Sequence, residues 1–382
     1  MEDLSQVREE IDQIDDRILS LFQRRMECAD KVAAYKAAHG LPVLDRSRER
    51  RVIEDSAAKV PPELRSYAQV LMQLLMEASR NRQHGLLDPE GNNVVRRIES
   101  AVSATPNLFP QDAFVACQGV EGAYSQIACD RIFHHADISF FDTFDGVFRA
   151  VEEGFCQYGV LPVENSTAGS VNQVYDLMMR HNFSIVRTCR LKIDHNLLAK
   201  PGVGLEEITD VYSHEQAINQ CHQFLSALHG VTVHVVENTA IASQMVARSE
   251  RPGVAAIASS SCAELYGLDP LARDIQDKGN NYTRFACISK DLQVFPGADR
   301  TSLMLVVSHR PGALFHVLEK FYALDINIFK LESRPIPDRD FEFMFYFDVD
   351  CPVAAPQFKE LIATIGDACE DVRYLGSYSE VV

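Results

Sequence analysis

Three clusters of neutral hydrogen-bonding side chains stand out along this 382-residue chain. They are residues 164–171 (ENSTAGSV), the pair Ser213–His214, and residues 281–285 (NYTRF). The last cluster places a guanidinium, Arg284, directly after a hydroxyl, Thr283. Amides, hydroxyls and one arginine suit a small carboxylate better than a metal, a phosphate or a nucleic acid, because they hold an anion through directed hydrogen bonds.

A second set of candidates is cationic and lies on an expected helix near the N-terminus. Apolar residues recur there at steps of three and four, namely Leu4, Val7, Ile11, Ile14, Ile18 and Leu21. Arg25 takes the next position of this seam, and Lys36 follows 11 residues later, so that both cations face the same way. A buried arginine is costly unless an anion meets it. Arg25 therefore either pairs with a carboxylate of a neighbouring helix or binds an anionic ligand inside a helical bundle.

Two further helices are expected, one beginning at residue 45 and one near residue 63. Polar residues share a face on each of them, because they are spaced three or four apart. They are Asp45, Arg48 and Glu49 on the second helix and Ser79 and Gln83 on the third. The first three helices thus offer cations, two carboxylates, a hydroxyl and an amide to one bundle.

This pattern resembles the all-helical class of chorismate mutase over residues 1 to about 85. Eight polar positions carry the resemblance: Arg8, Arg25, Lys36, Asp45, Arg48, Glu49, Ser79 and Gln83. It implies the rearrangement of chorismate, a dianion, to prephenate through a dipolar transition state that needs positioning and charge stabilisation but no nucleophile. By resemblance, arginines grip the carboxylates, Lys36 and Gln83 face the breaking ether oxygen, and Glu49 faces the ring hydroxyl. Asp45 and Ser79 are expected to bind substrate, and the other six residues to act in catalysis.

Arg8 and Arg25 cannot both touch one small ligand from a single straight helix. Their separation of 17 residues corresponds to about 25 Å along the helix and roughly 100° around it. If both serve one pocket, Arg8 comes from a partner subunit. We therefore expect an intertwined homodimer, with a tetramer as the alternative.

Residues 113–292 alternate short apolar runs with helical stretches, which is typical of an α/β domain. The expected strands are residues 114–117, 138–141, 158–163, 210–212, 231–236 and 254–258, and the expected helices include residues 126–133 and 145–153. Polar clusters follow several of these strands, where open α/β sheets bind ligands. Neither a G-x-G-x-x-G motif, nor a P-loop, nor an H-E-x-x-H zinc motif is present. Helix capping is the competing explanation for Ser125, Ser170 and Thr239.

Together these loops resemble prephenate dehydratase from about residue 114 to residue 289. The most specific pieces are ENS at 164–166 with Gly169, and TRF at 283–285. The resemblance implies two lobes around a cleft, as in periplasmic binding proteins, and the loss of carbon dioxide and water from prephenate to give phenylpyruvate. Thr283 is the expected catalytic hydroxyl, and the departing ring hydroxyl needs a proton donor that the resemblance leaves open. The expected substrate contacts are Asn165, Ser166, Thr167, Ser213, Gln216, Asn281, Arg284 and Phe285.

One loop departs from the family pattern. The family commonly has Ser-His-Pro-Gln where this chain has Ser-His-Glu-Gln at 213–216. The loss of proline is expected to change the backbone of this loop. The roles of Ser213 and Gln216 depend on that backbone.

Residues 300–382 read strand, helix, strand, strand, helix, strand, which is the ferredoxin-like order. The strand at 341–349 alternates strictly, and phenylalanine is expected at every inward position. The module resembles an ACT regulatory domain, through GALF at 312–315 and ESRP at 332–335. The resemblance implies that L-phenylalanine binds between paired ACT domains and inhibits the enzyme. The expected contacts are Gly312, Ala313, Leu314, Asn327, Glu332, Ser333 and Arg334. The competing explanation is that Gly312 only opens a helix and that Arg334 pairs with Glu332.

Bulk properties exclude several classes of protein. The net charge of −17 argues against nucleic acid and anionic membrane partners. Ten cysteines without a C-x-x-C pair, and an acidic N-terminus without an apolar leader, predict reduced thiols and a cytoplasmic protein. No apolar run approaches the roughly 20 residues of a membrane-spanning helix. Neither a metal nor an organic cofactor is expected.

We therefore expect a multidomain chain. Its parts are an all-α chorismate mutase domain (1–88), a linker (89–112) with a short helix around 94–101, a two-lobed α/β dehydratase domain resembling periplasmic binding proteins (113–292), and an α+β ferredoxin-like ACT domain (300–382). Such a chain would convert chorismate to prephenate and prephenate to phenylpyruvate in phenylalanine biosynthesis, with feedback inhibition by L-phenylalanine. The alternatives are a non-catalytic amino-acid sensor and a dehydratase that uses arogenate.

Overall fold

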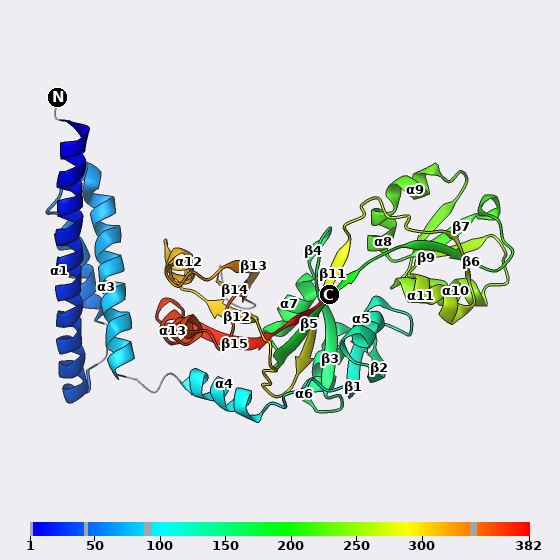
Figure 1. The fold of residues 1–382 in the computed structure, drawn as a ribbon. Helices are drawn as coiled ribbons and strands as arrows, with labels where there is room; N and C mark the ends of the chain where they lie inside the picture. Colours follow the sequence, from blue (N-terminus) through cyan, green and yellow to red (C-terminus); the bar gives the residue numbers. More distant parts are fainter. Residues whose placement is uncertain (1–2, 42–44, 88–92, 337–341) are drawn as a thin grey trace. The chain divides into compact units, whose positions relative to one another are not determined.

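The structure is a computed structural model that describes residues 3–41, 45–87, 93–336 and 342–382. Its contacts divide it into two compact units (Figure 1). One unit holds residues 1–97 and 359–368, and the other holds residues 98–358 and 369–382. No helix in the described part of the chain combines the length and apolarity needed to cross a membrane.

The first unit is helical, as the sequence predicts. Its helices are α1 (Leu4–His39), α2 (Arg46–Ala57) and α3 (Arg65–Leu87), with a 3₁₀ turn at Pro62–Leu64. Asp3 caps the start of α1, and Gly40 closes its end at a φ of 61°, a left-handed conformation that glycine adopts without strain. Asp45 caps α2 by accepting a 3.0 Å hydrogen bond from the backbone N–H of Arg48. Both α1 and α2 pack against α3, and Figure 1 shows α1 running alongside α3.

A fourth helix, α4 (Asn93–Ala104), follows. It confirms the short helix predicted around residues 94–101. Residues 89–92, the start of the predicted linker, lie outside the described residues.

The first α/β lobe is built on a seven-stranded sheet with the order β16-β5-β11-β3-β1-β2, in which β4 pairs with β3. The strands are β1 (Asp112–Gln118), β2 (His135–Phe141), β3 (Tyr158–Asn165), β4 (Gly169–Ser170), β5 (Ser184–Lys192), β11 (Tyr282–Ser289) and β16 (Glu380–Val381). Its helices are α5 (Tyr124–Ile132), α6 (Phe144–Glu152) and α7 (Asn172–Met178). Strand β11 lies antiparallel between β3 and β5, which aligns Thr283 with Asn165. The polar clusters at 164–171 and 281–285 therefore meet at one edge of this sheet.

The second lobe contains a five-stranded sheet with the order β10-β6-β9-β7-β8. Its strands are β6 (Asn196–Ala199), β7 (Asp210–Ser213), β8 (Thr232–Val235), β9 (Val254–Ala258) and β10 (Asp269–Ala272). Its helices are α8 (Glu215–Gln220), α9 (His222–Ala227), α10 (Thr239–Arg248) and α11 (Ser260–Tyr266), with a 3₁₀ turn at Leu205–Glu207. Two segments, 193–195 and 273–281, connect this lobe to the first. The two-lobed α/β architecture predicted from the sequence is confirmed.

The C-terminal region follows the predicted βαββαβ order. Its elements are β12 (Arg300–Val306), α12 (Ala313–Ala323), β13 (Ile328–Pro335), β14 (Phe343–Val349), α13 (Pro356–Ile365), a 3₁₀ turn at Gly366–Ala368 and β15 (Asp371–Tyr378). The sheet is antiparallel with the order β13-β14-β12-β15, which is the ferredoxin-like arrangement.

The prediction that phenylalanine occupies every inward position of β14 is wrong. Met344, Tyr346 and Asp348, on the opposite face, are at most 1% exposed, whereas Phe343 is 38% exposed. Met344 and Tyr346 belong to a core shared with the first α/β lobe, and the ring of Tyr346 lies 4.9 Å from that of Tyr175. The face that carries Met344, Tyr346 and Asp348 is therefore more completely buried than the phenylalanine face, and alternation alone does not predict which face of the strand turns inward.

Candidate active sites

A cavity of about 270 Å³ lies within the helical unit and is lined by α1, α2 and α3. It brings together seven of the eight residues predicted from the sequence: Arg25, Lys36, Asp45, Arg48, Glu49, Ser79 and Gln83. The eighth, Arg8, is exposed near the start of α1 and does not line the cavity.

Arg25 reaches across the cavity from α1 to α3. It donates hydrogen bonds to the backbone oxygen of Leu75 and to Oγ of Ser79. None of the ion pairs found among the described residues involves Arg25, so the alternative of an internal carboxylate partner is not realised there. Burial lowers the pKa of Arg25 from its ordinary value, which is high enough that the group stays charged. A partly buried cation without an acidic partner is a candidate for binding an anion, because burial of an unpaired charge is costly.

Two carboxylates of this cavity already have partners. Glu49 forms an ion pair with Arg80, a cavity residue that the sequence reasoning missed. Asp45 caps α2 and also accepts a 2.8 Å hydrogen bond from Oγ of Ser47. The pKa of Asp45 is lowered, and the main cause is the hydrogen bond from the backbone N–H of Arg48. Both acids are therefore held in fixed positions, and the lowered pKa of Asp45 favours its ionised form.

Gln83 is the amide of this cavity and is only 6% exposed. Its Oε1 has no hydrogen-bond partner among the described residues. A buried polar atom without a partner is uncommon in native proteins and often marks a position that a ligand or water completes. The atom therefore points to ligand binding in the same cavity that holds Arg25.

The second candidate site is a cavity of about 480 Å³ between the two α/β lobes. Residues of both lobes and of their connection line it, including Asn165, Thr283 and Phe285 from the first lobe. An adjacent cavity of about 450 Å³ is lined by Thr167 and Asn281. The two cavities share Ala168, His214, Gln216 and Gln220. They are neighbouring parts of one cleft.

Asn165 is held in this cleft by several hydrogen bonds. Its Oδ1 accepts hydrogen bonds from the backbone N–H groups of Thr167 and Ala168 and from Oγ1 of Thr167, at 3.0, 2.9 and 2.7 Å. Because three donors fix the oxygen, the orientation of the amide is determined. Its Nδ2 then donates to Oδ1 of Asn281 at 2.8 Å and to Oγ1 of Thr283 at 2.9 Å.

This network directs the hydroxyl hydrogen of Thr283. The Thr283 oxygen accepts from Asn165, so its own hydrogen is available to another acceptor. Thr283 lines the larger cavity. The arrangement offers a hydrogen-bond donor to a group bound there.

Gln220 continues the network toward the second lobe. Its Nε2 donates to Oγ1 of Thr167 at 2.7 Å, and its Oε1 accepts from Nδ2 of Asn281 at 2.9 Å. Nε2 of His195 lies 2.9 Å from the same Oε1. The sequence reasoning missed Gln220, although it follows Gln216 by one helical turn of α8. It also missed Gln118, Tyr124, His195, Glu237 and Asn238, which line the cavity without belonging to a recognisable motif.

Three predicted substrate contacts lie outside the cavity linings. Ser213 is fully buried and donates to the backbone oxygen of Ile257 at 2.7 Å. Ser166 donates to the backbone oxygen of Asn280 at 2.7 Å, which ties two loops together. The third is Arg284.

Arg284 lies on the face of β11 opposite to Thr283 and Phe285, because side chains alternate along a strand. Its guanidinium pairs with Asp348 of β14 and lies 3.8 Å from Glu164. Burial lowers the pKa of Arg284, but the charge of Asp348 raises it further, so that the net shift is upward. The side chain therefore ties β11 to β14, and the linings of the two cavities do not include Arg284.

The competing explanation that Ser125, Ser170 and Thr239 are helix caps is wrong. The residues at the cap positions of α5, α7 and α10 are Ala123, Val171 and Asn238. Ser125, Ser170 and Thr239 instead line the larger cavity. The hydroxyl of Ser170 donates to Glu332 and accepts a 2.7 Å hydrogen bond from Lys330.

A helical cavity with cations and a two-lobed cleft lined with amides and hydroxyls together define an enzyme with two sites for small anions. Comparison with known proteins agrees with both parts. Residues 7–84 match the family model of chorismate mutase type II, and residues 115–293 match that of prephenate dehydratase.

One relative matches nearly the whole chain, and two others match about 70% of it. The bifunctional chorismate mutase/prephenate dehydratase of Escherichia coli (strain K12) is 31% identical, over 97% of this chain and 95% of its own. Arogenate dehydratase/prephenate dehydratase 2 of Arabidopsis thaliana is 36% identical, over 69% of this chain and 72% of its own. The crystal structure of prephenate dehydratase from Arthrobacter aurescens in complex with L-Phe has a TM-score of 0.65 and 26% identity, over 70% of this chain and 89% of its own. The chain belongs to the family of bifunctional chorismate mutase/prephenate dehydratases.

Proposed function

We propose that the helical cavity rearranges chorismate and that the two-lobed cleft dehydrates the prephenate so formed. The chain is a bifunctional enzyme of phenylalanine biosynthesis that makes prephenate from chorismate and phenylpyruvate from prephenate. Two observations carry the assignment of sites. In one cavity, Arg25 has no acidic partner among the described residues, and in the other, Asn165 orients the hydroxyl of Thr283. An ultraviolet assay tests it: purified protein should consume chorismate and release phenylpyruvate, and failure to turn over either substrate would contradict it.

In the mutase cavity, Arg25 and Arg48 bind the two carboxylates of chorismate, and Lys36 and Gln83 face the ether oxygen. A half-turn of the Gln83 amide exchanges its unpaired Oε1 for Nε2, which can donate to that oxygen. Glu49, held by Arg80, faces the ring hydroxyl. The reaction then proceeds by confinement of a reactive conformer and by electrostatic stabilisation of the charge on the breaking bond.

In the dehydratase cleft, Thr283 donates its hydroxyl hydrogen to the departing ring hydroxyl of prephenate. The prephenate dianion takes up one proton and yields phenylpyruvate, carbon dioxide and water, so a hydrogen-bond donor at this oxygen favours departure. Asn165 orients Thr283, and Asn281, Thr167 and Gln220 hold Asn165 in place. The formation of an aromatic ring supplies the driving force.

Arogenate is the second candidate substrate of this cleft. It differs from prephenate by an ammonium in place of the keto group, and an acidic contact would favour it. Glu237 supplies a carboxylate among the residues that line the cavity. A relative that covers the α/β region is named for both substrates.

We infer that the mutase site is completed by a second copy of the chain. The predicted apolar seam of α1 is uncovered within one chain, with Leu4, Ile11, Ile18 and Leu21 between 51% and 62% exposed. Such a row of large apolar side chains on one helix is typical of an interface. A partner helix along this seam would bring its own Arg8 to the cavity that Arg25 occupies.

Subunit complementation tests this dimer. We expect Arg8→Ala and Arg25→Ala each to abolish mutase activity, because each removes a cation from every site. Co-expression of the two variants should restore up to about a quarter of the activity, since a mixed dimer holds one intact site. Chorismate consumption by the purified mixture is the measurement. An active monomer, or no recovery in proven mixed dimers, would contradict the shared site.

We propose that the C-terminal sandwich is an ACT domain that binds L-phenylalanine. The Arthrobacter relative was crystallised in complex with L-Phe. Gly312 adopts a φ of 81° at the start of α12, which suits glycine, and Phe315 and Tyr322 of α12 are 55% and 85% exposed. An apolar helix face of this kind is suited to pairing with a second ACT domain.

The polar groups of this region do not follow the competing explanation. Arg334 forms hydrogen bonds of 2.8 and 2.9 Å with the carboxylate of Asp176, on α7 of the dehydratase lobe. The strand β13, which carries Glu332, Ser333 and Arg334, therefore contacts the dehydratase lobe directly. A ligand bound at β13 has a short physical route to the cleft.

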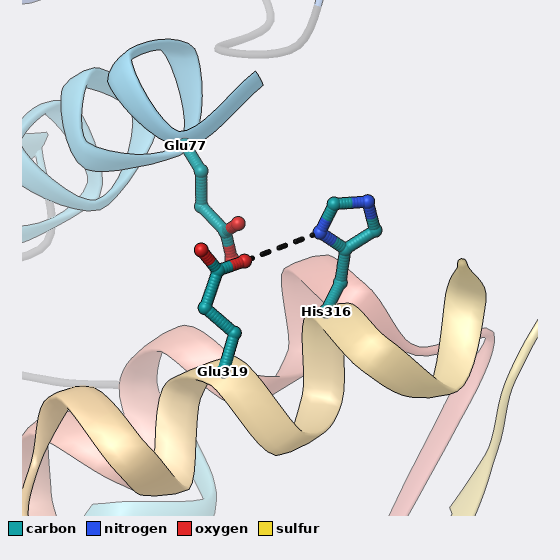
Figure 2. A group of neighbouring side chains, drawn as sticks. All are labelled: Glu77, His316 and Glu319. Carbon is teal, nitrogen blue, oxygen red and sulfur yellow. Dashed lines mark hydrogen bonds and ion pairs between the residues drawn. The ribbon is translucent and has the colours of Figure 1, made fainter. Parts of the chain in front are cut away.

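On the neighbouring helix α12, His316 and Glu319 lie one turn apart, and 3.4 Å separates Nδ1 of His316 from Oε2 of Glu319 (Figure 2). Figure 2 also draws Glu77, which belongs to α3 of the other unit.

Titration with L-phenylalanine tests the regulatory role. We expect L-phenylalanine to inhibit phenylpyruvate formation, and Ser333→Ala to raise the half-inhibitory concentration about tenfold, in the range of typical coupling energies. The uninhibited rate of the variant should match that of the unmodified protein. An enzyme insensitive to L-phenylalanine, or a variant with unchanged sensitivity, would contradict the assignment of this site.

A further inference from the structure

His195 lies in the segment that connects β5 of the first lobe to β6 of the second. The residue is 2% exposed and lines the larger cavity. Its backbone N–H donates to Oε1 of Gln276 at 2.8 Å, and the ring of Tyr124 meets its imidazole edge-on at 6.1 Å. The hydroxyl of Tyr124 already donates to the backbone oxygen of Asp194, so it offers no hydrogen to the imidazole. The ring is therefore held in place by its neighbours.

The hydrogen-bond network determines which ring nitrogen carries the proton. Nε2 of Gln220 donates to Oγ1 of Thr167, so the Gln220 atom that faces His195 is the acceptor Oε1. Nε2 of His195 must then be the donor in the 2.9 Å contact. In the neutral ring, Nδ1 is left with a lone pair. Burial lowers the pKa of His195, which favours this neutral form.

Nδ1 of His195 has no hydrogen-bond partner within the described part of the chain. An unpaired buried acceptor is unfavourable, and a donor that enters the cavity would relieve the cost. At neutral pH the prephenate dianion has only one such donor, its ring hydroxyl, because both carboxylates are ionised and the side-chain carbonyl carries no hydrogen.

We propose that Nδ1 of His195 accepts a hydrogen bond from the ring hydroxyl of the substrate and is a further substrate-binding residue of the dehydratase. A hydroxyl that donates to Nδ1 turns its lone pairs away from the imidazole. Those lone pairs are then free to accept from Thr283. His195 thereby orients the leaving group, and the chain of hydrogen bonds through Gln220, Asn281 and Asn165 joins His195 to Thr283.

Two substitutions separate this role from a purely structural one. In His195→Asn the amide oxygen replaces Nδ1, so the acceptor is kept and the contact with Gln220 is lost. In His195→Gln the amide nitrogen replaces Nε2, so the contact with Gln220 is kept and the acceptor is lost. We expect His195→Gln to lower kcat/KM for prephenate by about 10- to 100-fold, the usual loss for a buried polar group left unpaired. His195→Asn should retain at least about tenfold more activity than His195→Gln.

The measurement is phenylpyruvate formation from prephenate by the full chain, with chorismate consumption by the same preparations as the control for folding. If His195→Asn is no better than His195→Gln, or if both match the unmodified protein, the inference is overturned. Arogenate provides a second test, because its ammonium is another hydrogen-bond donor. The activity of His195→Gln should fall equally with prephenate and with arogenate, and a loss confined to arogenate would also overturn the inference.

This inference rests on the proposed assignment of the cleft as the dehydratase site, and the two can fail separately. Thr283→Ala, assayed in parallel, reports on the cleft itself. A dehydratase that survives Thr283→Ala refutes the site, whereas an inactive Thr283→Ala with unimpaired His195 variants refutes only the role of His195.

Discussion

Thr283→Ala is expected to lower phenylpyruvate formation from prephenate by about 10²- to 10⁴-fold, the usual contribution of a positioned proton donor. The physical reason is that Asn165 fixes the Thr283 oxygen as an acceptor, which leaves the hydroxyl hydrogen for the substrate. Chorismate consumption by the same protein should be unchanged, because the mutase cavity is built from α1, α2 and α3. Ultraviolet assays of both reactions on one preparation make the comparison.

Two control variants sharpen the test of Thr283. Thr283→Ser keeps the hydroxyl and should recover most of the activity, whereas Thr283→Val keeps the shape and should not. Tyr282→Phe removes a neighbouring hydroxyl that lines neither cavity and should have little effect. If Thr283→Val remained active, the hydroxyl would have no part in the reaction.

Arg25→Ala is expected to lower mutase activity by about 10²- to 10³-fold. This is the usual loss when an enzyme active site is deprived of one preorganised hydrogen-bond donor to developing negative charge. Arg25 is the cavity cation that bonds to Leu75 and Ser79 and has no acidic partner among the described residues. Its removal leaves a carboxylate of the dianionic substrate unpaired in a partly buried site. Dehydration of added prephenate should continue at its normal rate.

Arg24 is the matched control for Arg25. It is adjacent on the same helix, carries the same charge, is exposed and does not line the cavity. Arg24→Ala should leave both activities near normal. Equal losses in the two variants would mean that the general charge of α1 matters and that no specific contact of Arg25 does.

Local spacing placed polar residues on shared helix faces, and the resemblance to chorismate mutase joined them into one expected pocket. Arg25, Lys36, Asp45, Arg48 and Glu49 lie on helices whose faces follow from the 3.6-residue period, and the structure places all of them around one cavity. Arg80 could not be recognised in the same way. Its partner Glu49 lies on another helix, and no spacing rule links residues that meet only through tertiary packing.

The dehydratase cleft shows what sequence motifs cannot resolve. Strand alternation would have separated Thr283 and Phe285, which line the cavity, from Arg284, which faces Asp348. A serine that belongs to a polar motif can still be structural, as Ser213 is. His195 carried no signal, because it stands alone in a connecting segment and its neighbours Tyr124 and Gln220 are distant in the sequence.

The central claim is that the two cavities are independent active sites that act in sequence. An equimolar mixture of Arg25→Ala and Thr283→Ala, supplied with chorismate alone, tests it most directly. Neither variant is expected to form phenylpyruvate by itself, whereas the mixture should form it, because prephenate released by the Thr283→Ala protein is consumed by the Arg25→Ala protein. A mixture as inactive as its components, with each variant retaining its other activity, would show that the cavities do not act as two independent sites in sequence.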